Sequence, residues 1–521
     1  MKQLFEVGSD RLGRGPVTFA WSPNGQFIAT ASCQLRLLVH DRKGNLHDEI
    51  QIPGKVTQGQ CAAVQLAWDR RSEKLAILTA GSKPGIGDAV VVYKVRQREA
   101  MRLENVQMMK EMSHVAWDPQ GNVLSVGTAK GNLLLYDSRI GKTMSIMGKH
   151  TKGITCGAWS PDGRLALGGD DRQITVSLGN GDTEFQLAVK DKPKELQFAP
   201  EASSGGSLAA TKRLNQISAT LLGGLSSVYL YRLGEFGEDP PEIRNPAELK
   251  FDPYYGKIKS HHWAGAGYLV VCFDSGQCVL CRMEGGEMER ELCNMQPFTG
   301  AAAMAMKTAF CPDIGRLAVY SGNTVKMIDV SNGDLAENTG DALEFSVNCE
   351  VTCLGWSMEG QVLTVATGDG ELYTFLASLP NLCRAFGDRC AYLTSLLEVT
   401  VADVSQNKLR AVAIDQEPVF LALGHQHVSA GMNNQAWFYR VGPPEEGLEY
   451  PPERVNQREY MGSVDEVSMN DTLAAVRSEG RVNVHVIERN DDQTESMDFQ
   501  LPEADVTSAA MTRDFLVYGT A

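Results

Sequence analysis

The sequence predicts an all-β fold of tandem β-propellers, the first with seven blades and the second truncated at the C-terminus of the chain. Three observations carry this prediction. A unit of about 40–45 residues recurs along the chain. Each copy holds an aromatic residue followed in the best copies by a Pro-x-Gly turn, and strands with alternating apolar residues come after that turn. No segment has the apolar spacing of a long helix.

The recurring aromatic residues define the unit. The clearest copies read "WSPNGQF" from Trp21, "WDPQGNV" from Trp117 and "WSPDGRL" from Trp159. Successive anchors lie 39 to 49 residues apart except for one interval of 65, which contains the loop-like stretch at 201–216. The anchors are Trp21, Trp68, Trp117, Trp159, Phe198, Trp263, Phe310 and Trp356.

Each copy predicts the same order of elements. An apolar strand ends at the anchor, and in the Pro-x-Gly turn Pro presets φ while Gly takes a positive φ. An alternating strand, a polar turn and a further strand such as "NLLLYD" (132–137) follow. Several short strands per repeat correspond to one four-stranded propeller blade.

Counting anchors divides the chain into two domains. Seven anchors, from Trp21 to Phe310, predict a first seven-bladed propeller over residues 1–341, with "QLFEV" (3–7) closing the ring beside its last blade. Trp356 then opens a second propeller over 342–521, for which about four blades fit. Because an incomplete ring leaves strand edges unpaired, we expect the sequence to be the front part of a longer protein.

Composition narrows the function classes. The net charge is −15 and the pI about 5.2, which argues against nucleic acid as a partner. The start has no apolar signal-peptide core, and no apolar run is long enough for a transmembrane segment. The 12 cysteines are predicted to be free buried thiols in a reducing compartment, so a cytosolic protein is expected.

One stretch raises the question of catalysis. "GKHTKGITCGAWSPDGRLALGGDDRQITVS" (148–177) contains His150 and Asp171, a pair that a general base could use. The stretch resembles the WD-repeat family, in which a histidine near the start of the repeat bonds an aspartate in a later turn. The resemblance implies a structural hydrogen bond between His150 and Asp171, with Ser177 where the family usually has Trp.

A closer resemblance is carried by this stretch together with "CAYLTSLLEVTVADV" (390–404) and "SAGMNNQAWFYRV" (429–441). These blocks are similar to the tandem-propeller core subunits of intraflagellar transport complex A. The resemblance implies a long α-helical repeat region after the propellers, retrograde transport in cilia and flagella, and passage of membrane-protein cargo into cilia. It also implies the other subunits of that complex and cargo adaptors as partners, at the cilium and basal body on the cytoplasmic side.

Other chemical motifs are better explained as scaffold, and no cofactor or metal is expected. "IGKT" (140–143) has Tyr136 where a phosphate loop needs Gly, and "GSKPGIGD" (81–88) leads into a strand. Cys278 and Cys281 lie three apart in a strand and should point to opposite faces, as should the adjacent His261 and His262. Trp437 suits a core strand or an exposed binding surface.

Two acidic, Pro-rich segments are candidate loops, at 234–258 and 442–454. Each is either a solvated crossover or a partner-binding loop. The first ends in Tyr254 and Tyr255, which we single out as candidate partner contacts because tyrosines are common interface anchors.

The sequence therefore predicts a non-enzymatic scaffold of the ciliary transport complex. One alternative is a tandem-propeller subunit of a vesicle coat or another trafficking complex, which partner identity would distinguish. A propeller enzyme is the other alternative, and it would require polar residues converging at the mouth of the channel.

Overall fold

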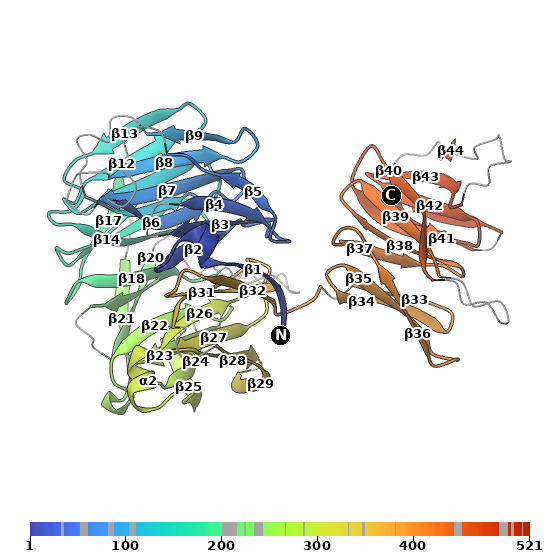
Figure 1. Ribbon diagram of the computed structural model, residues 1–521. Helices are drawn as coiled ribbons and strands as arrows, with labels where there is room; N and C mark the ends of the chain where they lie inside the picture. The colour runs from blue at the N-terminus through green and yellow to red at the C-terminus, as the bar shows by residue number, and fades with distance from the viewer. Residues whose placement is uncertain are drawn as a thin grey trace. The chain divides into compact units, whose positions relative to one another are not determined.

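The computed structural model describes residues 1–521 except 33–35, 53–60, 82–87, 104–110, 201–215, 223–225, 234–242, 266, 285–286, 332, 346–349, 381, 442–450, 489–498, 502–504, 513 and 521. The chain forms two compact units, Met1–Ala377 and Ser378–Ala521, in which short sheets stand side by side (Figure 1). Each unit is described by itself.

The described part of the first unit contains eight four-stranded antiparallel sheets, here called blades 1 to 8. The strands of each blade are bonded in chain order, and the fourth strand of blade 8 comes from the start of the chain. The blades are β2–β5 (Val17–Trp21, Phe27–Ser32, Leu37–Asp41, Leu46–Glu49), β6–β9 (Cys61–Trp68, Lys74–Gly81, Ala89–Lys94, Glu99–Arg102), β10–β13 (Met112–Trp117, Val123–Thr128, Leu133–Asp137, Lys142–Ile146), β14–β17 (Ile154–Trp159, Leu165–Gly169, Gln173–Ser177, Thr183–Ala188), β18–β21 (Pro193–Phe198, Gln216–Leu221, Ser227–Leu233, Ile243–Lys250), β22–β25 (Ile258–Trp263, Tyr268–Phe273, Cys278–Glu284, Glu287–Met295), β26–β29 (Lys307–Cys311, Arg316–Ser321, Thr324–Ser331, Asp334–Glu344) and β30–β32 with β1 (Val351–Trp356, Val362–Thr367, Leu372–Leu376, Lys2–Val7).

The ring of the first unit closes between blades 8 and 1. Strand β30 packs beside β2, and one core cluster joins Val17 and Ile28 of blade 1 to Val362 and Leu372 of blade 8. Strand β1 pairs antiparallel with β32, with Val7 opposite Leu372. The prediction that the N-terminal strand closes the ring is confirmed (Figure 1).

The predicted blade number and domain boundary were wrong. Trp356 ends the inner strand of blade 8 and does not open a second ring, so the first unit runs to Ala377 and not to residue 341. The segment "AENTGDA" (336–342), which marked the predicted boundary, lies within strand β29 at the outer edge of blade 7. Blade 7 has its own outer strand, β29, so β1 instead completes an eighth blade whose other three strands are β30–β32.

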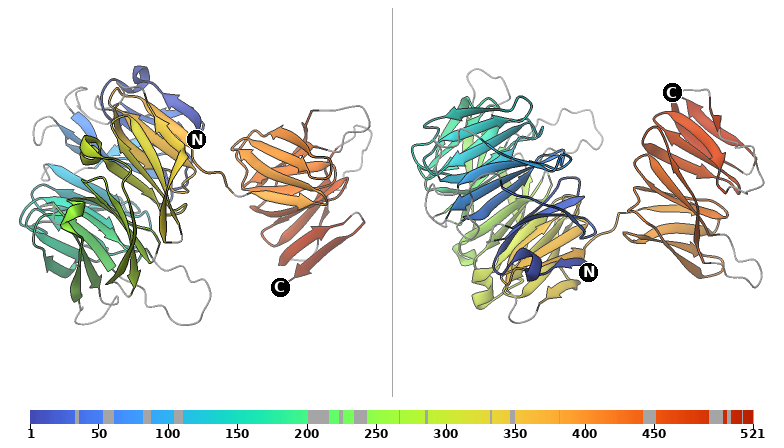
Figure 2. Two further views of the ribbon diagram at one scale, coloured as in Figure 1. Left: turned by 90° about the horizontal axis from the view of Figure 1, so that it is seen from below. Right: turned by 45° about the horizontal axis from the view of Figure 1, so that its top comes forward.

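The second unit follows the same pattern. Its described residues form three four-stranded sheets and one two-stranded sheet, whose first strands contact one another in chain order (Figure 2). The sheets are β33–β36 (Cys383–Phe386, Arg389–Ser395, Glu398–Asp403, Lys408–Ala413), β37–β40 (Phe420–Leu423, His427–Met432, Gln435–Arg440, Glu453–Glu459), β41–β44 (Val464–Met469, Leu473–Ser478, Arg481–Val486, Phe499–Gln500) and β45–β46 (Val506–Met511, Leu516–Thr520).

Helical structure is confined to short turns in the residues that the structure covers: α1 (Ser9–Leu12), the 3-10 turn η2 (Pro253–Tyr255) and α2 (Gly300–Ala305). None of these is long or apolar enough to cross a membrane. The all-β tandem-propeller fold that the repeats predicted is confirmed.

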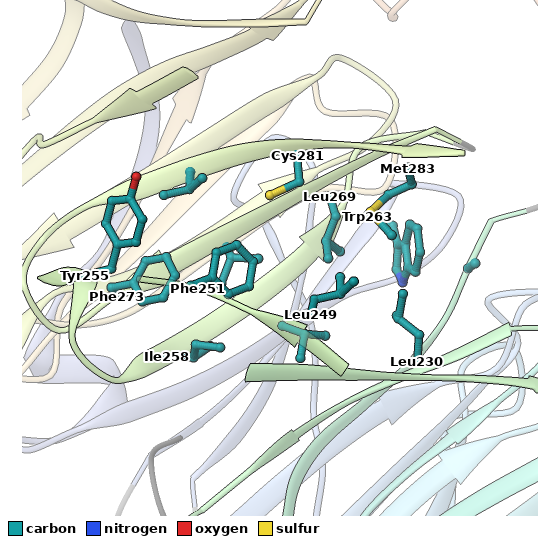
Figure 3. Packing of buried hydrophobic residues seen from close by; sticks show 14 residues of the cluster. Leu230, Leu249, Phe251, Tyr255, Ile258, Trp263, Leu269, Phe273, Cys281 and Met283 are labelled. Atoms are coloured by element: carbon teal, nitrogen blue, oxygen red, sulfur yellow. The ribbon is translucent and has the colours of Figure 1, made fainter. Parts of the chain in front are cut away.

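The cores lie between blades. In the cluster shown in Figure 3, Leu230 and Leu249 of blade 5 pack against Trp263, Leu269 and other residues of blade 6. Every blade therefore depends on its neighbours for burial, because one sheet has two faces to cover.

Candidate functional site

The His150–Asp171 pair makes the hydrogen bond that the WD-repeat resemblance implies. His150 precedes β14, and Asp171 lies in the turn between β15 and β16. The His150 Nδ1 atom lies 3.0 Å from Asp171 Oδ1, and the Nε2 atom lies 3.0 Å from the hydroxyl of Thr175 in β16. The bond thus joins the start of the blade to its third strand.

The His150–Asp171 pair is buried, and hydrogen bonds to Asp171 keep its carboxylate ionised. The His150 side chain is 0% exposed and that of Asp171 is 7% exposed. Burial acts to raise the pKa of Asp171, but the His150 hydrogen bond and the backbone N–H groups of Thr151 and Gln173 outweigh it and hold the pKa below its usual value. The carboxylate is therefore held ionised by local donors.

The geometry does not suit a general base. A catalytic imidazole needs one nitrogen directed at a substrate, and both nitrogens of His150 are occupied by buried partners of the same blade. A hollow of about 480 Å³ has His150, Asp171 and Thr175 among its lining residues, but the His150 side chain has no exposed surface there.

Thr175 is the member that sequence reasoning missed. Ser177, which stands where the family usually has Trp, is buried, and its hydroxyl has no hydrogen-bond partner among the described residues. Strand alternation puts residues 173, 175 and 177 on one face, so the signal was present, but only the geometry shows which of them His150 reaches.

The tryptophan anchors make bonds between blades. The indole Nε1–H of Trp68 donates to the carbonyl of Ala20 at 2.9 Å, that of Trp117 to Ala67 at 3.1 Å and that of Trp159 to Ala116 at 3.2 Å. Trp356 donates likewise to the carbonyl of Ala309 at 3.0 Å. Each acceptor is the residue just before the anchor of the preceding blade.

Two further anchors reach side chains of the preceding blade. Trp21 donates to Thr364 Oγ1 of blade 8 at 2.9 Å, and Trp263 to Ser218 Oγ of blade 5 at 2.9 Å. The bond of Trp21 crosses the closure of the ring. Phe198 and Phe310, the anchors of blades 5 and 7, have no indole and cannot donate.

A second set of contacts runs to the following blade. The inner strands of blades 3, 4, 5, 6 and 8 have a register shift at their second residue, which turns that side chain out of the sheet. From these positions Ser113 donates to the carbonyl of Ile154 at 2.6 Å and Thr155 to that of Pro193 at 2.9 Å. The Nζ of Lys194 donates to the carbonyl of Lys259 at 2.6 Å. These bulges were not predicted, because alternation alone does not reveal one inserted residue.

The predicted tyrosine pair is split by the structure. Tyr254 is 74% exposed, whereas Tyr255 is 8% exposed and stacks on Phe273 (Figure 3). The hydroxyl of Tyr255 accepts a hydrogen bond from Asn294. The assignment of Tyr255 as a partner contact was wrong, because its ring fills the core between blades 5 and 6. Tyr254 stays a prediction.

The loops containing candidate contacts also differ from expectation. Residues 243–250, expected in a crossover loop, form the outer strand β21 of blade 5. Residues 234–242 of that segment and 442–450 of the second segment lie outside the described residues, as do 82–87 of the Gly-rich motif. The "IGKT" stretch lies at a turn leading into β13, as predicted.

The remaining candidates are placed in the core. Cys278 and Cys281 belong to different core clusters on opposite faces of β24, as predicted, and Trp437 is 2% exposed in the core of the second unit. His261 and His262 diverge as predicted: His261 contacts Ser218 at 2.8 Å and His262 contacts Thr308 at 2.9 Å. No group of three His, Cys, Asp or Glu residues suited to a metal occurs within the described residues.

Comparison with known proteins agrees with this architecture. Residues 17–370 match the family described as the WDR19 first β-propeller, and residues 390–521 the WDR19 second β-propeller. The gap between the two matches contains the structural boundary at Ala377.

Similar proteins were found in several animals. WD repeat-containing protein 19 of Homo sapiens is 32% identical over 531 residues, covering 100% of this chain and 37% of the relative. WD repeat-containing protein dyf-2 of Caenorhabditis elegans is 25% identical, covering 99% and 36%. The chain thus spans little more than a third of the length of these relatives.

One solved structure supports the fold. The C-terminal WD40 domain of Sif2 superposes with a TM-score of 0.54 at 13% identity, covering 73% of this chain and 98% of that domain. At this identity the likeness shows the fold alone.

Proposed function

The chain belongs to the WDR19 family of tandem β-propeller proteins, and from this premise we propose that it is a non-enzymatic scaffold subunit of intraflagellar transport complex A. In this role it supports retrograde transport in cilia and flagella and the passage of membrane-protein cargo into cilia. Its partners are the other subunits of the complex and cargo adaptors, at the cilium and basal body.

One observation carries the proposal: both propellers of the chain match the two WDR19 families in the same order. The side chains that could have formed a catalytic dyad, His150 and Asp171, are instead bonded within one blade. This arrangement supports a role in which the propellers act by presenting their surfaces to other proteins.

Affinity purification of the full-length protein from ciliated cells, followed by identification of the copurified proteins, tests the proposal. We expect the other subunits of the ciliary complex to copurify stoichiometrically. Depletion of the protein should cause cargo to accumulate at ciliary tips, the signature of failed retrograde transport. Copurification of vesicle-coat subunits without ciliary transport proteins would overturn the proposal in favour of a coat.

A further inference from the structure

Three lysines lie on successive blades at one end of the first-unit ring. Lys194 and Lys259 occupy the bulged second position of inner strands β18 and β22, and Lys307 opens inner strand β26. Blades 3, 4 and 8 carry Ser113, Thr155 and Thr352 at the bulged position, so among these bulged positions lysine occurs on blades 5 and 6. We call Lys194, Lys259 and Lys307 the lysine rim.

Lys259 lies at the start of β22, and contacts between blades place the amines of Lys194 and Lys307 at the same end of the inner strands. The Nζ of Lys194 lies 2.6 Å from the backbone carbonyl of Lys259, and that of Lys307 lies 3.4 Å from the carbonyl of Thr352 on blade 8. Both amines are thus drawn toward the neighbouring inner strand. A carbonyl satisfies one donor of an ammonium group, which has three, and does not neutralise its charge.

The lysine rim lacks carboxylate partners within the described residues. The ion pairs of nearby lysines are Lys192 with Asp170 and Lys190 with Glu248, and neither involves the rim. Glu195, next to Lys194 in sequence, is directed toward His261, whose Nδ1 lies 3.4 Å from its carboxylate. The rim therefore retains positive charge in a protein with a net charge of −15.

Two carboxylates near the rim accept hydrogen bonds from backbone N–H groups. Asp252 accepts the N–H of Tyr254 at 2.8 Å, and Asp274 accepts the N–H of Lys257 at 2.7 Å. Lys257 itself is exposed beside the rim. The exposed Glu350 immediately precedes β30 on blade 8.

Exposed apolar side chains accompany the lysines. Leu222 is 62% exposed, Tyr254 is 74% exposed and Met304 is 68% exposed. Tyr254 and Met304 lie on the connections that lead into β22 and β26, and the backbone N–H of Leu222 donates to the carbonyl of Lys192 just before β18. All three therefore lie at the end of the ring where the rim lies.

We propose that the lysine rim and these apolar side chains form a docking surface for an extended acidic peptide segment of a partner protein. Carboxylates of the peptide pair with the lysines of blades 5 to 7, and an apolar residue between them contacts Tyr254 or Met304. An extended segment suits this arrangement because alternate side chains point to the same side.

The observations favour a peptide over a membrane or a nucleic acid. Anionic membranes attract broad basic clusters, whereas this patch consists of a few lysines bordered by Asp252 and Glu350. Nucleic acid would meet the negative charge of the rest of the chain. The surface does not depend on which transport complex the protein serves, so its test and the test of the proposed function can fail independently.

The proposal is tested by fluorescence anisotropy on the full chain with a labelled peptide in which Glu alternates with Ser around a central Phe. We expect saturable binding at low ionic strength that weakens with added salt, and none for the same peptide with Gln in place of Glu. The double variant Lys259→Gln/Lys307→Gln should weaken binding about tenfold, since each partly exposed pair contributes modestly. Tyr254→Ala should weaken it further.

The matched control is Lys2→Gln/Lys142→Gln, which removes the same charge from exposed lysines of strands β1 and β13 at the outer edges of blades 8 and 3. This variant should bind the peptide like the parent, and both variants should keep the parent's melting temperature. Equal loss in both would show nonspecific charge attraction and overturn the proposal. Absence of peptide binding by the parent, or rim-dependent binding of phosphatidylserine vesicles in its place, would also overturn it.

Discussion

His150→Ala tests whether the His150–Asp171 bond is structural. The substitution removes a buried bond to an ionised carboxylate, which typically contributes about 1.5–3 kcal/mol. It also leaves the Thr175 hydroxyl, which is 2% exposed, without the imidazole as a partner. Some of that second cost overlaps the first, so we expect the free energy of unfolding of the first unit to fall by about 2–4 kcal/mol.

A double-mutant cycle with Thr175→Val separates the two contributions. Thr175→Val alone should cost about 1–3 kcal/mol, since it keeps the shape of the side chain but leaves the buried Nε2 of His150 without that partner. Once His150 is Ala, replacing Thr175 removes an unpaired buried hydroxyl, so the double variant should be about 1 kcal/mol more stable than additivity predicts.

The pH dependence gives an independent signature. Asp171 has a folded pKa below its unfolded value near 3.8, so its contribution to stability is complete above that value and is lost as pH falls through the folded pKa. The stability difference between the parent and Asp171→Asn should therefore be constant above about pH 5 and shrink below about pH 4.

Calorimetry of the first-unit transition measures these effects, and partner copurification in the cold measures function. Partner binding should survive His150→Ala wherever the variant remains folded. A variant with an unchanged melting temperature that has lost partner binding would refute the structural assignment, as would strict additivity in the cycle.

Three further predictions concern other parts of the chain. Glu488→Gln should lower the melting temperature of the second unit at pH 7, because hydrogen bonds, above all that from Arg440, lower the pKa of Glu488 to about 2. The difference from the parent should fade as pH falls toward 2, and an unchanged difference at low pH would contradict this prediction. Tyr255→Ala should lower the melting temperature of the first unit by several degrees, as removal of a buried aromatic does, while Tyr254→Ala should leave it nearly unchanged; the reverse ranking would contradict the burial pattern. A fragment ending at 377 should be monodisperse, whereas one ending at 341 lacks β30–β32 and should aggregate, as size-exclusion chromatography can show.

Much of the fold could be predicted from the sequence because large aromatic residues recur at the period of the blades. Seven of the eight anchors end the inner strands, Phe310 is the last-but-one residue of β26, and the His150–Asp171 bond followed from one well-preserved repeat. The blade count was not accessible in the same way. Ring size depends on how many blades close against each other in space, and a linear list of anchors does not state where closure occurs.

Side-chain direction was the other limit. Tyr254 and Tyr255 are adjacent in the turn η2, yet Tyr254 is exposed and Tyr255 is in the core. Neighbouring residues of so short a turn point in different directions, which the sequence does not reveal. The bulged positions were hidden for a related reason. A one-residue insertion in a strand reverses the direction of a side chain without changing the apparent alternation around it.

The bonds between blades explain how such repeats can diverge and still close. Four anchors donate to a backbone carbonyl of the preceding blade, so the bond does not depend on the neighbour's side chain at that position. Where the anchor of blade 7 is Phe310, which cannot donate, Thr308 of the same strand contacts His262 and Ser260 of blade 6. Polar side chains thus replace the missing indole bond at this interface.

Because ring closure depends on anchors and backbone, the bulged positions at the end of the ring are free to carry different residues on different blades. The lysine rim occupies these positions on blades 5 and 6, where a change of side chain alters what the ring can bind without opening it.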